Sequence, residues 1–162
     1  MQRVAYLRLF VFQYNFGMQV EQVKIITEEL WNAFQRLLPQ LTLNNTPPSY
    51  DDLSALLRTE STILLIARTE QKGFIVGAAS LIVYRVPTGV RAIIEDVVVD
   101  ESTRRQGIGE ALVLRLLDIA REKGAKGVGL TSNPKREAAN QLYQRLGFKR
   151  RETNSYYYLF ER

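Results

Sequence analysis

The segment "RRQGIG", residues 104–109, places two arginines beside two closely spaced glycines, between a valine-rich stretch and a predicted amphipathic helix. Glycines at the start of a helix let another molecule approach the backbone closely, and the N–H groups of the first turn attract anions. The segment therefore indicates either an anion-binding loop or a plain helix-opening turn whose arginines are solvated.

Two common phosphate-binding loops do not fit this segment. A P-loop carries Lys and then Ser or Thr after its second glycine, whereas Glu110, Ala111 and Leu112 follow here. A dinucleotide-binding fingerprint needs a third small residue where Leu112 stands, and it belongs to an early βαβ unit. What remains is the pattern Arg/Gln-x-x-Gly-x-Gly/Ala over residues 104–109, whose amides would bind a pyrophosphate.

The chain contains no histidine and no cysteine, which narrows the acid–base chemistry. Histidine bases, thiol nucleophiles, disulfides and zinc sites built on these residues are excluded, and we expect no metal site. The best candidate for a base is Glu95 in "IEDVVV", with Asp96 expected on the opposite face of the same strand. A surface or salt-bridged carboxylate is the competing interpretation of Glu95.

Length and charge limit the class of protein without choosing a partner. A chain of 162 residues with 46% hydrophobic content is long enough for one well-buried core and short for two. Its net charge of +5 suits a polyanionic partner, which includes nucleotides, nucleic acids and membranes. The stretch "KRRETNSYYY" resembles a basic and aromatic nucleic-acid surface, but a solvated strand start with tyrosines lining the sheet or an acceptor site is the favoured interpretation.

Residues 1–17 are apolar and aromatic, so a signal peptide or membrane anchor has to be considered. Arg8 interrupts the apolar run, no small-residue cleavage site follows, and the stretch is too short to span a bilayer. We therefore expect an N-terminal extension to a single domain at residues 18–162, packed on that domain or on a second copy in a homodimer. The expected location is the cytoplasm, with no membrane or nucleic-acid partner.

Hydrophobic periodicity predicts an α/β fold in which helices flank a mixed sheet. Thr27 is expected to cap the first helix and Pro39 to stop it, while Ser49 and Asp52 resemble a capping box for the second. Strands are expected at 21–27, 62–68, 74–84, 90–100, 127–130 and a final one containing "YYYLF"; helices are expected at 28–38, 49–57, from 108 to Gly124, and from Asn133 to Gly147.

The sequences "IEDVVVDESTRRQGIGEALV" and "NPKREAANQLYQRLGF" together resemble the GNAT superfamily of acetyl-CoA-dependent N-acetyltransferases. The element order matches over residues 18–162, and the specific motifs occupy 93–148. "IEDVVV" is also similar to the corresponding strand of glucosamine-6-phosphate N-acetyltransferases, without fixing the acceptor. The resemblance implies a mostly antiparallel sheet in which the strand of Val97–Val99 splays from that of Val128 and Leu130, leaving a wedge for the pantetheine arm.

The same resemblance implies the residues that contact acetyl-CoA. Backbone groups near Val97, Val98 and Val99 would pair with the pantetheine arm, although their side chains are expected to be ordinary core. The residues expected at the pyrophosphate are Arg104, Arg105, Gln106, Gly107, Ile108, Gly109 and Glu110, and those expected from the later helix are Asn133, Arg136 and Asn140. Asn133 also has a competing interpretation, in which its side chain caps the N-terminus of that helix.

The implied reaction is transfer of an acetyl group to a primary amine of a small molecule or protein. An aliphatic amine is protonated near neutral pH, so Glu95 is expected to deprotonate it directly or through water. Backbone N–H near Val97 would stabilise the oxyanion, and Tyr143 would protonate the thiolate unless it is only a core aromatic. Without cysteine, transfer should be direct. A non-catalytic acyl-CoA sensor is the alternative function.

Overall fold

The computed structural model describes residues 12–14, 17–41, 46–70 and 73–160, and it divides between Thr131 and Ser132 into two compact units. Glu95 and the 104–109 loop belong to the first unit, whereas Tyr143 belongs to the second. Of the predicted N-terminal extension, residues 1–11 and 15–16 lie outside the described residues.

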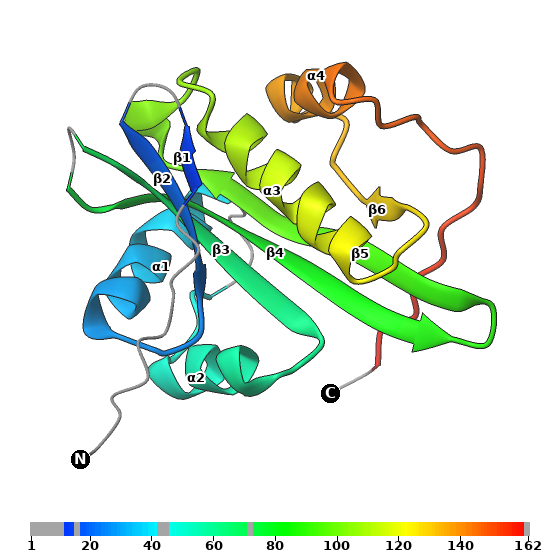
Figure 1. The fold of residues 1–162 in the computed structure, drawn as a ribbon, viewed down its shortest axis with the longest axis horizontal. Coiled ribbons are helices and arrows are strands. Elements are labelled where there is room, and N and C mark those ends of the chain that lie inside the picture. Colours follow the sequence, from blue (N-terminus) through cyan, green and yellow to red (C-terminus); the bar gives the residue numbers. More distant parts are fainter. Residues whose placement is uncertain (1–11, 15–16, 42–45, 71–72, 161–162) are drawn as a thin grey trace, which may run out of the picture. The chain divides into compact units, whose positions relative to one another are not determined.

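A six-stranded sheet forms the centre of the first unit, with its strands in the order β1-β2-β3-β4-β5-β6 (Figure 1). Neighbouring strands pair antiparallel, except that β6 runs parallel to β5. This mixed, mostly antiparallel sheet confirms the predicted fold class. The strands are β1 (Phe12–Tyr14), β2 (Met18–Val23), β3 (Thr62–Thr69), β4 (Ile75–Val86), β5 (Gly89–Val99) and β6 (Val128–Leu130).

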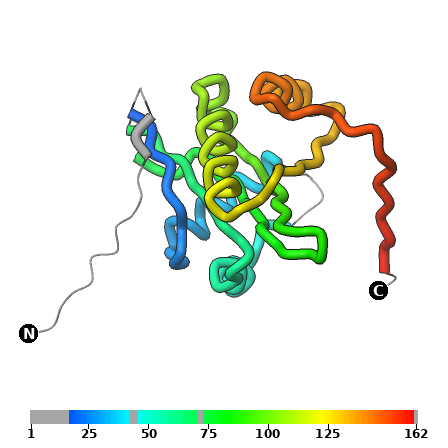
Figure 2. The backbone as a smooth tube through the Cα atoms, turned by 45° about the vertical axis from the view of Figure 1, so that its right-hand side comes forward, coloured from blue at the N-terminus to red at the C-terminus, as the bar shows by residue number. Residues whose placement is uncertain are grey.

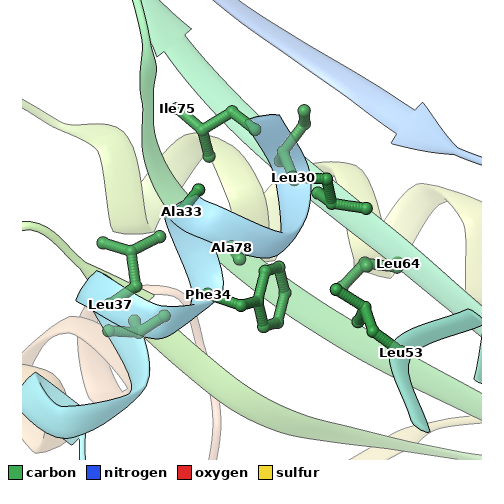
Figure 3. Close-up of a cluster of buried hydrophobic side chains, with 10 residues drawn as sticks. Leu30, Ala33, Phe34, Leu37, Leu53, Leu64, Ile75 and Ala78 are labelled. Atoms are coloured by element: carbon green, nitrogen blue, oxygen red, sulfur yellow. The ribbon is translucent and has the colours of Figure 1, made fainter. Parts of the chain in front are cut away.

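Helices α1 (Glu28–Leu41) and α2 (Tyr50–Arg58) cover one face of this sheet. Both predicted caps are confirmed: Thr27 Oγ1 accepts from Leu30 N–H at 3.1 Å, and Ser49 and Asp52 form a capping box. Apolar side chains of the two helices pack on inward-facing residues of β3 and β4 (Figure 3), which removes the hydrophobic stripe of each helix from water. The labelled cluster comprises Leu30, Ala33, Phe34, Leu37, Leu53, Leu64, Ile75 and Ala78.

Helix α3 (Ile108–Glu122) packs on the other face, as the backbone trace also shows (Figure 2). Successive residues of a strand point to opposite faces, and on β4 Ala78 belongs to the α1 cluster while Gly77 lies against Ile108 and Leu112 of α3. The helix ends before Gly124, which has a left-handed φ of 81°, as predicted.

A β-bulge interrupts β5 next to the predicted base. Ser80 of β4 pairs with Glu95 and Ala78 pairs with Val98, so that two residues of β5 stand opposite one residue of β4. Asp96, one of those two residues, has a positive φ of 51°. Strict alternation of side chains between the two faces of a strand predicts Asp96 on the face opposite Glu95. The bulge interrupts this alternation at Asp96, because it changes the direction in which the residues that follow it point.

The second unit contains helix α4 (Glu137–Arg145) and the C-terminal segment. The helix ends before Gly147, as expected, but it begins three residues later than Pro134 because a turn occupies residues 134–135. The predicted final strand is wrong for the described residues, since 149–160 contain no strand. A β-pattern forms a strand only where a neighbour satisfies its backbone, and the aromatic side chains at 156–158 and 160 are exposed.

Three boundaries in the first unit also differ from the sequence prediction. Helix α1 includes Pro39 and ends at Leu41, because a proline in the last turn removes only the hydrogen bond to Gln35. Strand β2 begins at Met18 and ends at Val23, before the expected "KIIT". Residues 12–14 of the extension form β1 on the edge of β2, which the sequence prediction did not assign as a strand.

Candidate active site

The 104–109 loop is held in an unusual backbone conformation. A 3₁₀ turn at Glu101–Thr103 leads into it, and both Arg105 and Gly107 have left-handed φ values, 65° and 77°. No atom of the described chain lies within 4 Å of a Cβ added to Gly107, so glycine is needed there for its backbone freedom. The space beside Gly107 is open, as an approaching ligand requires.

The loop also presents the N-terminus of α3. The first hydrogen bond of the helical ladder runs from Ala111 N–H to Gly107 C=O at 2.9 Å, so the amides of Ile108 and Gly109 precede that ladder. The Ile108 side chain is buried in the core, while Arg104, Arg105, Gln106 and Glu110 are exposed. The loop is thus anchored by Ile108 and offers backbone amides and guanidinium groups on its outer side.

The edge of β5 beyond the bulge lies outside the pairing with β6. The two strands pair at Ala92 with Val128, Ile93 with Gly129 and Ile94 with Leu130, and this pairing ends there. Residues 97–99 continue β5 past that point, and Val97 and Val98 are buried as ordinary core while Val99 is half-buried. The end of pairing at Ile94 agrees with the splayed strand pair that the sequence predicts.

Glu95 stands at the bulge with its side chain exposed. Partial desolvation at the sheet surface raises the pKa of this carboxyl above its ordinary value, and the nearby negative charge of Asp96 raises the same pKa further. Its direct cross-strand partner, Ser80, is buried on the face that carries α1 and α2. A carboxylate with a raised pKa holds a proton more strongly, which suits a general base.

In the second unit, Asn133, Arg136 and Asn140 lie at the start of α4. Asn133 Oδ1 accepts from Lys135 N–H at 2.9 Å, and Asn140 Nδ2 donates to the Asn133 carbonyl at 3.0 Å. Arg136, rather than Asn133, occupies the N-cap position. The side chains of both asparagines therefore support the turn before α4, and their contact with acetyl-CoA stays a prediction.

Tyr143 lies on the buried side of α4 with 6% of its surface exposed. Its ring meets Phe148 edge to face, with centroids 5.8 Å apart and an interplanar angle of 65°. Burial raises the pKa of the Tyr143 hydroxyl, while the Arg136 charge lowers it by a smaller amount. The phenol is therefore protonated at neutral pH, as a proton donor must be. The burial of the ring and its contact with Phe148 also support the interpretation of Tyr143 as a core aromatic.

One set of residues near the loop was missed by the sequence analysis. Arg36 of α1 forms an ion pair with the buried Asp100, which immediately follows β5, and Gln40 Oε1 accepts from Glu101 N–H at 2.8 Å. Arg36 and Asp100 are 64 positions apart in the sequence, so no hydrophobic or charge periodicity indicates that they pair. The only available hint was an aspartate directly after a run of buried valines.

Comparison with known proteins decides the family. Residues 24–148 match the Acetyltransferase (GNAT) family. The chain belongs to this family. This acetyltransferase is 33% identical over 138 residues to a protein of Trypanosoma brucei brucei named glucosamine 6-phosphate N-acetyltransferase, covering 81% of this chain and 90% of that protein. The predicted family, the acyltransferase class and N-acetyl transfer are thereby confirmed.

Solved structures share the fold of this GNAT acetyltransferase. A Trypanosoma brucei acetyltransferase is 30% identical with a TM-score of 0.70, covering 88% of this chain and 99% of that one. An aminoglycoside acetyltransferase from an uncultured soil metagenomic sample has a TM-score of 0.78 at 21% identity, covering 92% and 100%, and shows the fold alone. GNAT proteins generally use acetyl-CoA. Within the described residues, no helix is both long and apolar enough to cross a bilayer.

Proposed function

We propose that this GNAT acetyltransferase binds acetyl-CoA through the 104–109 loop and the outer edge of β5, and transfers the acetyl group directly to a primary amine. One observation carries the proposal: the pairing of β5 with β6 ends at Ile94, and the same strand leads through Asp100 into the left-handed loop that opens α3. An extended pantetheine arm fits a strand edge beyond the point where the pairing with β6 ends, and a pyrophosphate fits amides at a helix N-terminus.

The proposed chemical step uses groups on β5 together with Tyr143 of α4. Glu95 removes a proton from the acceptor ammonium, directly or through water, and the free amine attacks the thioester carbonyl. A carbon–nitrogen bond forms, negative charge develops on the carbonyl oxygen, and backbone N–H near Val97 stabilises that charge. The carbon–sulfur bond then breaks, and the departing thiolate takes a proton from Tyr143. The attacking nitrogen, which is positively charged after the attack, gives up one proton through water to Tyr143, so that the products are a neutral amide and a free thiol. The absence of cysteine from the chain supports direct transfer over a thioester-linked enzyme.

An amino sugar is the proposed acceptor class, and glucosamine 6-phosphate is the first compound to test. The support is the 33% identical relative that carries the name glucosamine 6-phosphate N-acetyltransferase and aligns over 90% of its own length. The net charge of +5 is consistent with an anionic sugar phosphate but does not distinguish it from other anions.

The experiment is thiol release from acetyl-CoA with a panel of amines: glucosamine 6-phosphate, glucosamine, an aminoglycoside, spermidine and a lysine peptide. We expect amine-dependent release, highest with an amino sugar. Tight acetyl-CoA binding without release from any amine would favour a sensor domain instead. A salt-dependent mobility shift with a single-stranded oligonucleotide, in a protein that does not bind acetyl-CoA, would favour the nucleic-acid module.

A further inference from the structure

Arg36 of α1 makes contacts that hold it in one orientation. Nη1 is paired with the Asp100 carboxylate, and Nη2 donates to the Ile75 carbonyl at 2.6 Å. The guanidinium also lies over the Phe74 ring, 4.7 Å from its centroid. Arg36 therefore joins α1 to the start of β4 and to the residue that follows β5.

Asp100 connects that arginine to the entry of the loop. Its Oδ2 pairs with Arg36, while Oδ1 accepts from Ser102 N–H at 3.0 Å and from Ser102 Oγ at 2.7 Å. Its carbonyl accepts from Thr103 N–H at 2.9 Å, and its own N–H donates to the Val76 carbonyl at 2.8 Å. The Oδ1 atom and the carbonyl of this buried residue thus fix the 3₁₀ turn at Glu101–Thr103, while Oδ2 and the N–H tie the residue to α1 and β4.

Gln40 adds a second link, one helical turn beyond Arg36. Its Oε1 accepts from Glu101 N–H at 2.8 Å, and its Nε2 donates to the Arg36 carbonyl at 3.2 Å. Residues i and i+4 of a helix lie on the same side, so Arg36 and Gln40 present adjacent polar groups to one target. Helix α1 therefore contacts two consecutive residues, Asp100 and Glu101, where the turn that precedes Arg104 begins.

We propose that Arg36 and Asp100, assisted by Gln40, are positioning residues that fix the 104–109 loop to α1. The inference rests on the proposed function, in which that loop binds the pyrophosphate. A loop that holds a non-glycine residue, Arg105, in the left-handed region is costly to keep in one conformation, and the part-buried, charge-assisted contact between Arg36 and Asp100 at its entry limits the alternatives. Neither residue touches the reacting atoms in this account.

The most specific test is Asp100→Asn. The asparagine can keep its oxygen toward Ser102, but its NH₂ group then faces the Arg36 guanidinium, and donor meets donor. The substitution therefore removes the link to α1 while it preserves the local turn. Gln40→Leu removes the second link without changing any charge. Asp118→Asn is the matched control, because it breaks an exposed pair with Arg121 on α3 at 3.2 Å, away from the loop entry.

Amide hydrogen exchange of the ligand-free protein gives a readout that is independent of catalysis. In Asp100→Asn we expect peptides covering 101–109 to exchange about tenfold faster or more, equivalent to about 1.4 kcal/mol of local opening, while those covering 112–120 keep the wild-type rate. Gln40→Leu should show a smaller change in the same peptides. Asp118→Asn should leave the loop unchanged.

Calorimetry then connects loop order to binding. Asp100→Asn should weaken acetyl-CoA binding about tenfold. Arg36→Met should weaken it as well, and Arg36→Lys should weaken it less than Arg36→Met, because lysine keeps the positive charge but not the two-pronged guanidinium. Turnover at saturating acetyl-CoA should stay close to wild type, since positioning acts through KM rather than kcat.

Two outcomes would overturn the inference. One is wild-type exchange at 101–109 together with wild-type acetyl-CoA affinity in Asp100→Asn. The other is exchange that rises equally in β5, the loop and all of α3, because this would show general destabilisation. If the wild-type protein binds no acetyl-CoA, the proposed function fails, and the exchange comparison still decides whether Asp100 fixes the loop.

Discussion

Gly77 of β4 lies against Ile108, the first residue of α3: a Cβ atom at position 77 would be 2.9 Å from Ile108 Cγ2 and 3.2 Å from Leu112 Cδ1. The Val98 carbonyl is also 3.2 Å from that point. Only glycine lets the start of α3 approach the sheet this closely, because any larger residue would push the helix outward. The close packing of Gly77 on Ile108 therefore sets the distance between β4 and the start of α3, which the 104–109 loop precedes.

The first prediction is that Gly77→Ala lowers the free energy of unfolding by about 1–3 kcal/mol, the usual cost of overpacking. Gly127→Ala is the control, since a Cβ there has no atom of the described chain within 4 Å. Urea titration of both variants measures the difference. Equal stability of the two variants would show that α3 is not held against Gly77.

The pH dependence of kcat/KM tests Glu95. Desolvation and the Asp96 charge raise the Glu95 pKa, so activity should rise with pH through a limb above the ordinary glutamate range. Asp96→Asn removes the like charge and should move this limb to lower pH, and asparagine tolerates the positive φ of 51°. Glu95→Gln should lower turnover and abolish the limb, with acetyl-CoA affinity unchanged. An identical limb in all three proteins would exclude Glu95 as the base.

Tyr143→Phe separates the two roles of that ring. The substitution keeps the edge-to-face packing on Phe148 and deletes only the hydroxyl, so the melting temperature and acetyl-CoA affinity should change little. Thiol release at saturating substrates should fall. A positioned general acid typically contributes roughly 10² to 10⁴-fold, and we expect a loss below that range here because a thiolate is already a tolerable leaving group. Wild-type turnover would leave Tyr143 as a core residue only. A collapse of the fold would show that the hydroxyl itself is structural.

Acid stability tests the ion pair between Glu29 and Arg68. Hydrogen bonds from Arg68 lower the Glu29 pKa in the folded state, and one of them is 2.8 Å long. A lowered folded pKa gives stability that is present above the unfolded pKa and lost as pH falls through the folded pKa. Because Glu29 is half exposed, Glu29→Gln should cost at most about 1 kcal/mol at pH 7, and this cost should shrink as pH falls through the folded pKa.

Glu28→Gln is the control for that measurement, because it removes the same charge from the same helical turn. Arg68 pairs with Glu21 and Glu29, so the Glu28 substitution leaves its ion pairs intact. Free energies of unfolding at pH 3, 5 and 7 are compared for the two variants. The same pH dependence in both would assign the effect to net charge rather than to the ion pair.

The sequence predicted elements well where local signals and the tertiary structure agree. The caps at Thr27 and Ser49, the hairpin of β3 and β4, and the glycine stop at Gly124 all depend on neighbouring residues. The prediction of a final strand failed because a strand depends on a partner that no local pattern encodes, and residues 149–160 form no strand. Pro39 was misjudged because a proline in the last turn costs one bond only.

The candidate site divides in the same way. The loop could be predicted because its signals are local: its two glycines lie within six consecutive residues, directly before a helical pattern. The bulge at Asp96 was not, because it is defined by the count of residues on β4 as well as on β5. The Arg36–Asp100 pair was also missed, since long-range ion pairs depend on the completed fold rather than on sequence spacing.

The most direct test of the account compares acetyl-CoA binding by Gly107→Asp and Gly107→Asn. Both side chains are nearly the same size, both tolerate the left-handed φ of 77°, and both enter open space, so they differ chiefly in one negative charge. If the loop binds the pyrophosphate, calorimetry should show the aspartate variant binding at least about tenfold more weakly than the asparagine variant, with equal melting temperatures. Equal affinities of the two variants for acetyl-CoA would contradict the account.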